Sequence, residues 1–345
     1  MTRRILFATL VLAPIAIGLH YAADLSETTE FALSALALIP LAWLIGEATQ
    51  HAAEHTGPGI GGFLNATFGN APELIIALIA VNEGLTEVVR GSLIGSVVSN
   101  LLLVLGAALV AGGRGRLDRY SSFIAFGLLA FATVLLLIPS IAGWQGDPDR
   151  DSLAVLSVPV AIALLLVYVA VTVYSLRRHH SLHVASDEEI RGWSLRASVV
   201  ALGIATVTTA LVAEILVGSL EVFSEKVGLS QFFVAAVIVA IVGNAAEHGG
   251  AVIVAFRGKI ALAGEIALSS AAQVAVFLIP AVALLSWLIE PLALSFRPVE
   301  MAALGASVVY TTVILFGGQS SRLRGGLLLA GYAVVIVAFF LAGDR

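Results

Sequence analysis

Long apolar stretches separated by short polar breaks dominate this sequence. A helix needs about 20 apolar residues to cross a hydrocarbon core of roughly 30 Å. Eleven segments of the 345-residue chain meet or approach that length. They cover residues 5–23, 31–46, 58–81, 91–113, 121–142, 152–175, 195–217, 230–256, 264–289, 299–317 and 325–342. The sequence therefore predicts an all-α integral membrane protein with eleven transmembrane helices.

The composition argues against several other classes of protein. Charged residues make up 12% of the chain and hydrophobic residues 59%, whereas a soluble domain has about 25% charged residues. So few charges do not suit a water-soluble enzyme or a disordered chain. The net charge of -5 leaves no basic surface for nucleic acid. Because the chain has no cysteine, it has no disulfide and no thiolate metal site.

The basic residues indicate how the helices are oriented. Positive charges collect on cytoplasmic loops. With a cytoplasmic N-terminus, eleven crossings place 13 of the 18 basic residues on the cytoplasmic side. These are Arg3, Arg4, Arg114, Arg116, Arg119, Arg177, Arg178, Arg191, Arg196, Arg257, Lys259, Arg322 and Arg324. We therefore expect a multi-pass protein of a prokaryotic-type inner membrane, with its N-terminus in the cytoplasm.

The first apolar segment has two interpretations. Arg3 and Arg4 followed by an apolar stretch are also typical of a signal peptide. However, the stretch is long, and His20-Tyr21-Ala22 is a poor cleavage site. We therefore interpret residues 1–25 as a retained N-terminal transmembrane helix.

The two halves of the sequence resemble each other. The sequence GNAPE at 69–73 matches GNAAE at 243–247, and six of 14 positions are identical between 69–82 and 243–256. The repeat unit is five helices. Because five is odd, the second copy enters the membrane from the opposite side, which is an arrangement found in secondary transporters. The sequence thus predicts one N-terminal helix plus two inverted five-helix repeats.

The repeats define the expected domain boundaries. The first repeat covers residues 26–176 and the second covers 194–345, and residues 177–193 join them. This connection, RRHHSLHVASDEEIRGW, carries many charges of both signs. We interpret it as a solvated cytoplasmic linker. The alternative is a regulatory, ion-sensing segment that uses Asp187, Glu188 and Glu189.

Glu73 and Glu247 occupy equivalent positions in the two repeats, each inside a long apolar segment. A carboxyl group at membrane depth costs about 2.5–3.5 kcal/mol on insertion scales, so such groups are usually functional. A local hydrogen bond between helices would explain one buried glutamate. It does not explain two at symmetric positions, each three residues after an asparagine. We therefore predict that the two carboxylates form one ion-binding site near the bilayer midplane.

Neutral oxygen donors accompany the two glutamates. Asn70 and Asn244 lie three residues before them, and two i, i+4 pairs follow on the next helix of each repeat. These pairs are Ser96 with Asn100 and Ser269 with Gln273. Hard oxygen ligands in a flexible arrangement suit Ca²⁺ better than Mg²⁺. All eight residues are candidate ligands or lining residues of the ion path.

The charge of the site predicts its mechanism. Two carboxylates neutralise one divalent cation, and two facing carboxylates without a cation favour binding protons. We therefore expect two protons and one Ca²⁺ to compete for Glu73 and Glu247. No G-x-x-x-x-G-K-[ST] motif for ATP is present. The sequence thus predicts an ion-driven carrier and not an enzyme. We expect it to need no cofactor, and its expected partners are Ca²⁺, H⁺ and the lipid bilayer.

Four segments carry a family resemblance. LNATFGNAPELIIALIAV (64–81) and GNAAEHGGAVIVAF (243–256) resemble the two signature repeats of the calcium/proton exchanger family. GSVVSNLLLVLG (95–106) and SSAAQVAVFLIP (269–280) resemble the helices that follow them. The resemblance spans residues 31–342. It implies an eleven-helix antiporter with Glu73 and Glu247 as its Ca²⁺/H⁺ sites.

The sequence departs from relatives of this family at two places. Related sodium/calcium exchangers carry an extra acidic residue near the position of Asn100 or Gln273, and both residues are neutral here. This argues against sodium coupling. Pro72 stands where the family more usually has a small or hydroxyl residue.

Several alternatives remain at this stage. Exchange of Mn²⁺ or Na⁺ for H⁺ on the same scaffold is the alternative transport function. His51, Glu54 and His55 match H-x-x-E-H, so a membrane zinc protease is a distant alternative. His248, Glu47 and Glu221 are candidate proton-relay or gating residues; a packed histidine and interfacial glutamates explain them equally well.

Overall fold

The computed structural model describes residues 2–180 and 192–344, which are almost entirely helical. The first half contains α1 (Thr2–Thr9), α2 (Leu12–Ala22), α3 (Glu27–Gly69), α4 (Ala71–Asn82), α5 (Thr86–Val98), η1 (Ser99–Val104), α6 (Leu105–Gly112), β1 (Gly115–Arg116), α7 (Arg119–Gly143) and α8 (Asp151–His180). The second half contains α9 (Leu195–Gly218), α10 (Leu220–Val227), α11 (Gln231–Phe233), η2 (Val234–Val239), α12 (Ala240–Gly243), α13 (Ala245–Phe256), α14 (Ile260–Gln273), η3 (Val274–Leu278), α15 (Ile279–Leu285), η4 (Ser286–Leu288), α16 (Pro298–Ile314), β2 (Gln319–Ser320) and α17 (Arg322–Ala342). Segments η1, η2 and η3 are π-helical turns within longer helices, and η4 is a short 3₁₀-helix.

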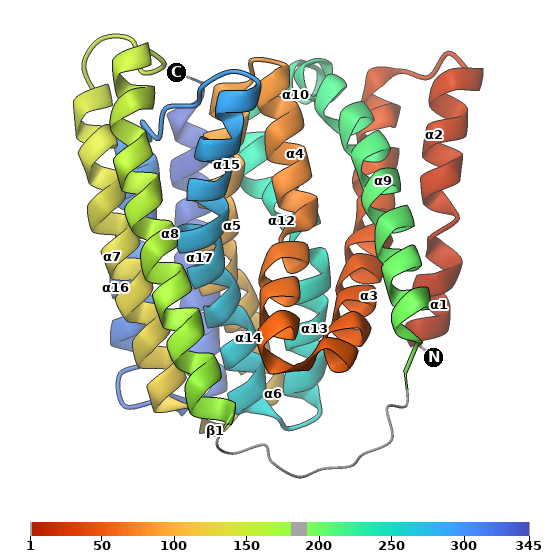
Figure 1. Ribbon diagram of the computed structural model, residues 1–345. Coiled ribbons are helices and arrows are strands. Elements are labelled where there is room, and N and C mark those ends of the chain that lie inside the picture. Colours follow the sequence, from red (N-terminus) through yellow and green to blue (C-terminus); the bar gives the residue numbers. More distant parts are fainter. Residues whose placement is uncertain (1, 181–191, 345) are drawn as a thin grey trace.

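The helices form an elongated bundle, with the two chain termini at opposite ends (Figure 1). Within the described residues, seven helices are long and apolar enough to cross a bilayer, or eight if the bent pair Leu220–Val227 and Gln231–Gly243 is one span. Four shorter apolar helices complete the bundle: Leu6–Ala22, Ala71–Asn82, Ala245–Phe256 and Pro298–Ile314. Termini at opposite ends require an odd number of crossings. The number eleven itself stays a prediction.

Two of the predicted segments are joined in the structure. We expected a break between 31–46 and 58–81, but α3 runs from Glu27 to Gly69 without one. The intervening residues 47–57 include three alanines, two glutamates and one glutamine, which are good helix formers. The ribbon of α3 instead bends back at its lower end in Figure 1, and Glu27–Thr56 is the part of it that is long and apolar enough to cross a membrane. Asp187, Glu188 and Glu189 of the predicted linker lie outside the described residues.

Side-chain caps begin four of the long helices. The side chains of Ser26, Asp118, Ser194 and Ser321 accept a hydrogen bond from the backbone N–H three residues later. Such a cap satisfies one of the free donors of the first turn and typically contributes about 1 kcal/mol. The polar breaks of the sequence therefore define where the apolar helices start.

A buried, non-helical segment follows α15. Residues 292–297 are extended and buried, after Pro291 interrupts the helical pattern. Irregular backbone is tolerated inside a membrane protein only where other groups satisfy it. Here three hydroxyl groups from three helices accept its amides: Ser286 from Leu292, Ser157 from Leu294 and Ser140 from Phe296. The indole of Trp144 donates to the carbonyl of Phe296 over 3.0 Å.

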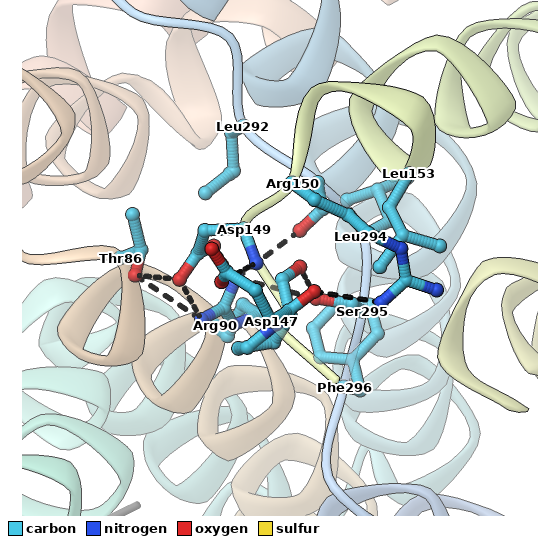
Figure 2. A network of polar contacts seen from close by, with 12 residues as sticks. Thr86, Arg90, Asp147, Asp149, Arg150, Leu153, Leu292, Leu294, Ser295 and Phe296 are labelled. Carbon is cyan, nitrogen blue, oxygen red and sulfur yellow. Dashed lines mark hydrogen bonds and ion pairs between the residues drawn. The ribbon is translucent and has the colours of Figure 1, made fainter. Parts of the chain in front are cut away.

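A buried arginine completes this arrangement (Figure 2). Arg90 of α5 is 1% exposed, and its Nη1 donates to Asp149 Oδ1 over 2.6 Å and to the carbonyl of Ala293 over 3.3 Å. Its Nη2 donates to Thr86 Oγ1 over 3.1 Å. Arg90 thus connects α5, the loop between α7 and α8, and the extended segment of the second half.

The two halves approach each other closely where α5 packs against α11 and η2. A Cβ atom on Gly95 would overlap the backbone of Ala236, and one on Gly91 would lie 2.9 Å from the ring of Phe232. Glycines four residues apart let two helices approach to backbone contact. Because Ser96 and Asn100 continue from α5 and η2 leads to Asn244, this contact determines how the predicted site residues meet.

Candidate functional site

Both predicted glutamates lie in the first turn of a half-helix near the middle of the bundle. The helical chain breaks at Asn70 (φ -100°, ψ 14°) and at Asn244 (φ -88°, ψ 9°). Helix α4 begins after the first break and α13 after the second; they extend toward opposite ends of the bundle in Figure 1. Glu73 and Glu247 are each the third residue of their half-helix. Glu73 is buried and Glu247 half-buried.

Each carboxylate lies against the helix break of the opposite half. A Cβ atom built on Gly243 would lie 3.1 Å from Cγ of Glu73 and 3.5 Å from its Oε1. A Cβ atom on Gly69 would lie 3.9 Å from Oε1 of Glu247. The repeats therefore exchange partners: the glycine of each GNAxE sequence borders the glutamate of the other. This arrangement brings the two acidic groups to one region of the interface between the halves.

The predicted amide side chains also pair across the halves. Asn70 Nδ2 donates to Gln273 Oε1 over 3.4 Å. Asn100 Nδ2 donates to Asn244 Oδ1 over 3.1 Å. The sequence repeat relates Asn70 to Asn244 and Asn100 to Gln273, so the two hydrogen bonds are equivalent contacts. Each one ties the break of one repeat to the following helix of the other.

The predicted serines join the same two amide pairs. Asn244 Nδ2 donates to Ser96 Oγ over 2.9 Å, and Gln273 Nε2 donates to Ser269 Oγ over 3.2 Å. All six neutral residues chosen from the sequence thus lie in hydrogen-bonded groups at the two breaks. Their side chains present amide and hydroxyl oxygens beside the two carboxylates.

One residue of this region was not identified from the sequence. The hydroxyl of Ser270, a buried residue of α14, donates to Oε2 of Glu247. Alignment of the repeats selected Ser269, because it corresponds to Ser96. With a one-residue gap in the loop before this helix, the position equivalent to Ser270 is Val97; without the gap, the offset of 174 residues pairs Ser270 with Ser96, a signal that the gapped alignment passed over. Only the packing of α14 against α13 identifies this contact.

Glu73 borders a small cavity. Its volume is about 10 Å³, close to the least space that admits one water molecule. It is lined by Glu73, Ile76, Ser92, Leu93, Ser96, Val239 and Ala240. Oε2 of Glu73 is buried and has no hydrogen-bond partner among the described residues. A buried carboxylate oxygen without a donor is able to accept a proton or contact a cation.

Two π-helical turns lie at or directly after the neutral ligand candidates Asn100 and Gln273. Asn100 lies in η1, and Gln273 directly precedes η3. The repeat relates these two turns to each other. A π-turn is rare and is frequently found at functional sites, because it interrupts the regular helical hydrogen bonds. The two turns therefore place equivalent interruptions next to equivalent side chains.

The three candidate relay or gating residues lie in different surroundings. His248 is half-buried next to Glu247, and its buried Nε2 has no hydrogen-bond partner in the described part of the chain. Glu47 lies on α3 with its Oε1 3.5 Å from Nε2 of His51. Glu221 is exposed on α10. Only His248 is thus adjacent to the central carboxylates.

The H-x-x-E-H residues make a different kind of contact from that of a zinc site. Nδ1 of His51 lies 3.2 Å from Oε2 of Glu54, and Nε2 of His55 lies 2.8 Å from the carbonyl of Trp193. The rings of His51 and Trp193 are 5.4 Å apart. Residues 2–180 and 192–344 hold no group of three or more His, Cys, Asp or Glu side chains placed to bind a metal. The two histidines connect α3 to Trp193, two residues before the start of α9.

Comparison with known proteins gives matches to both halves and to the whole chain. The sodium/calcium exchanger protein family matches residues 28–177 and again residues 197–341. The Ca²⁺/H⁺ antiporter of Synechocystis sp. is 37% identical, over 98% of this chain and 97% of that protein. The Ca²⁺/H⁺ antiporter ChaA of Bacillus subtilis is 37% identical, over 90% of this chain and 92% of its own length.

Solved structures match over nearly the full length. The structure of native YfkE has a TM-score of 0.83 at 34% identity and covers 99% of this chain and all of its own. The H⁺/Ca²⁺ exchanger CAX has a TM-score of 0.76 at 15% identity, covering 99% of this chain and 92% of its own, and shows the same fold. The chain is thus a membrane transport protein of this fold. It belongs to the sodium/calcium exchanger protein family, within its calcium/proton exchanger branch.

Proposed function

We propose that this chain exchanges cytoplasmic Ca²⁺ for H⁺ at one site that contains Glu73 and Glu247. The observation that carries the proposal is the crossed arrangement of the repeats. Glu73 borders Gly243 of the second half, and Glu247 borders Gly69 of the first half. Two acidic groups at one interface between halves suit one divalent cation. The names of the relatives, Ca²⁺/H⁺ antiporters, support the same assignment.

The donor set favours Ca²⁺ as the transported cation. Ca²⁺ takes about 6–8 oxygen ligands in flexible geometry. The amides of Asn70 and Asn244 and the hydroxyl of Ser96 lie in the hydrogen-bonded groups of the two breaks, beside the two carboxylates. Asn100 and Gln273 are neutral, so the site lacks a third acidic group for additional monovalent cations. Release of Ca²⁺ lets the two glutamates take up protons, which keeps the empty site neutral as it reorients.

We further propose that eleven crossings and two inverted repeats support alternating access. The N-terminal helix covers residues 1–25, the repeats cover 26–176 and 194–345, and 177–193 connect them. The separate family matches to 28–177 and 197–341 agree with two related halves. Termini at opposite ends of the bundle agree with an odd number of crossings. The basic residues favour a cytoplasmic N-terminus in a prokaryotic-type inner membrane.

Reconstituted liposomes test the proposal directly. Uptake of ⁴⁵Ca is measured with and without an imposed pH gradient, and Mn²⁺ and Na⁺ are added as competitors. We expect calcium movement to require the gradient and to carry protons in the opposite direction. Calcium flux that ignores the pH gradient would overturn proton coupling, and driving by Na⁺ would favour the alternative antiport.

Charge-neutral variants test the site. We expect Glu73→Gln and Glu247→Gln each to abolish exchange, because one remaining carboxylate cannot neutralise a dehydrated divalent cation. Glu265→Gln is the matched control, since Glu265 is an exposed glutamate of α14. Size-exclusion profiles and unfolding temperatures report whether each variant folds. Wild-type flux in either site variant would refute the assignment.

A further inference from the structure

Three loops meet at the end of the bundle that carries β1. Strand β1 pairs antiparallel with β2, with Gly115 opposite Ser320 and Arg116 opposite Gln319. Ser320 Oγ also donates to the carbonyl of Gly113 over 2.7 Å. The loop between α6 and α7 is thereby fastened to the loop between α16 and α17, although the two are about 200 residues apart in sequence.

Glycines bring the third loop against this strand pair. A Cβ atom on Gly115 would overlap the side chain of Ile260, and one on Gly112 would lie 2.7 Å from its Cδ1. Ile260 is the first residue of α14, directly after Arg257 and Lys259. The turn between α13 and α14 therefore lies beside β1 with two basic residues.

Seven basic residues gather on these loops, and we call them the basic platform. They are Arg114, Arg116, Arg119, Arg257, Lys259, Arg322 and Arg324. All except Arg324, which is half-buried, are exposed. Contacts between the loops bring some of them together. A Cβ atom on Gly113 would lie 3.7 Å from Nε of Arg322, and one on Gly318 would lie 3.1 Å from Cγ of Arg119.

The basic platform has little internal charge compensation. None of its seven residues forms an ion pair with a carboxylate in the described part of the chain. Asp118, within the same loops, accepts the backbone N–H of Ser121 over 2.7 Å. Nη1 of Arg324 donates to the carbonyl of Gln319, so this residue is partly engaged within the platform. The seven cations, held by a strand pair and a tight helix turn, thus present a positive surface.

Exposed apolar side chains border the basic platform. Phe256 is 72% exposed and directly precedes Arg257, and Leu323 is 74% exposed between Arg322 and Arg324. Phe316, at the end of α16, is 84% exposed. Large exposed apolar groups beside cations are typical of the level at which acyl chains meet phosphate headgroups. The pattern therefore suits a lipid better than a soluble anion.

We propose that the basic platform binds the phosphate group of an anionic phospholipid headgroup. Under the proposed orientation it faces the cytoplasmic leaflet, whose anionic lipids attract basic segments near the membrane. Binding would hold together the ends of α6 and α14. These helices lead directly to Asn100 and Gln273, so the lipid would stabilise the frame of the candidate site.

Thermal unfolding of the purified full-length chain tests this proposal without reference to transport. The unfolding midpoint is measured in detergent with added phosphatidylglycerol, with the same amount of phosphatidylcholine, and with inorganic phosphate. We expect phosphatidylglycerol to raise the midpoint by a few degrees, because a ligand that binds only the folded state stabilises it. Phosphatidylcholine and inorganic phosphate should produce no comparable rise.

A pair of matched variants locates the effect. Arg116→Gln/Arg322→Gln removes two charges of the basic platform, and Arg196→Gln/Lys226→Gln removes two exposed charges elsewhere. We expect the first variant to lose most of the rise produced by phosphatidylglycerol and the second to keep it. Native mass spectrometry should show fewer retained anionic lipids on the first variant alone. An equal rise in both variants, or an equal rise with phosphatidylcholine or inorganic phosphate, would overturn the proposal.

Discussion

Glu73 and Glu247 occupy related positions but differ in their immediate partners. Ser270 donates to Glu247, whereas the equivalent position beside Glu73 is Val97. Oε2 of Glu73 has no hydrogen-bond partner among the described residues and lies by a small cavity. The two acidic groups are thus not interchangeable. We infer that Glu247 is held in place, while Glu73 keeps a free acceptor for the incoming ion.

Ser270→Ala tests the role of this hydroxyl. A hydrogen bond to a charged group contributes about 1.5–3 kcal/mol, so we expect apparent Ca²⁺ affinity to fall by roughly tenfold or more. Ser270→Thr should retain most of the affinity. Ser219→Ala is the control, because its hydroxyl bonds only backbone carbonyls of its own helix. Calcium-dependent ⁴⁵Ca uptake gives the KM, and an unchanged KM in Ser270→Ala would contradict this role.

The two glycines at the helix breaks should tolerate alanine differently. In Gly243→Ala the added methyl group would lie 3.1 Å from Cγ of Glu73, so this carboxylate must shift. In Gly69→Ala the nearest atom is 3.9 Å away, an ordinary contact. Because small displacements of reacting groups are costly, we expect about a tenfold loss of flux in Gly243→Ala. Flux in Gly69→Ala should stay close to that of the wild type, and equal losses in both would argue against this geometry.

At the scale of elements, the buried extended segment after α15 depends on side chains of other helices. Ser140, Ser157 and Ser286 accept its amides, and Arg90 donates to its Ala293 carbonyl. The segment and the Arg90 pair hold the N-terminal end of α5. Because α5 continues to Ser96 and Asn100, this anchor fixes the first-half residues of the candidate site relative to the second half.

The Arg90–Asp149 pair gives a stability prediction. Removing one partner of a fully buried ion pair costs about 3–5 kcal/mol, and less where solvent screens one partner, as it does Asp149 here. Arg90 is almost fully buried and Asp149 is partly exposed, so Asp149→Ala should lower the unfolding temperature strongly by leaving the buried cation without its partner. The double variant Arg90→Met/Asp149→Ala should be less destabilised than the sum of the single variants. Asp151→Ala removes an exposed acid of the same region and should change the unfolding temperature little. If the losses of stability in the two single variants simply add up in the double variant, the pairing of Arg90 with Asp149 is contradicted.

The whole molecule presents its charges asymmetrically. The basic platform lies at the end of the bundle that carries β1, while the loop between α7 and α8, with Asp147 and Asp149, lies at the far end, where Asp149 pairs with Arg90. This separation agrees with a cytoplasmic platform under the rule for positive charges.

Single-cysteine labelling tests the orientation, since the chain has no native cysteine. We expect Arg116→Cys and Arg322→Cys to react with a membrane-impermeant maleimide only after cells are opened. Asp147→Cys and Lys226→Cys should react in intact cells. Labelling of the first and second pairs from the same side would exclude an orientation with eleven crossings and a cytoplasmic N-terminus.

The sequence by itself determined the class of the protein, because apolar length and scarce charge leave a chain no stable alternative to membrane helices. The repeat of GNAPE and GNAAE also predicted the two acidic residues and, with a one-residue gap in the alignment, six neutral ones, since internal similarity needs no knowledge of packing. Only the tertiary structure decided which groups touch. Four features join residues that are distant in sequence or in different helices. They are the contact of Gly243 with Glu73, the hydrogen bond of Ser270 to Glu247, the contacts of Arg90 and the convergence of three basic loops. Their contacts depend on how helices pack, and no local pattern encodes that.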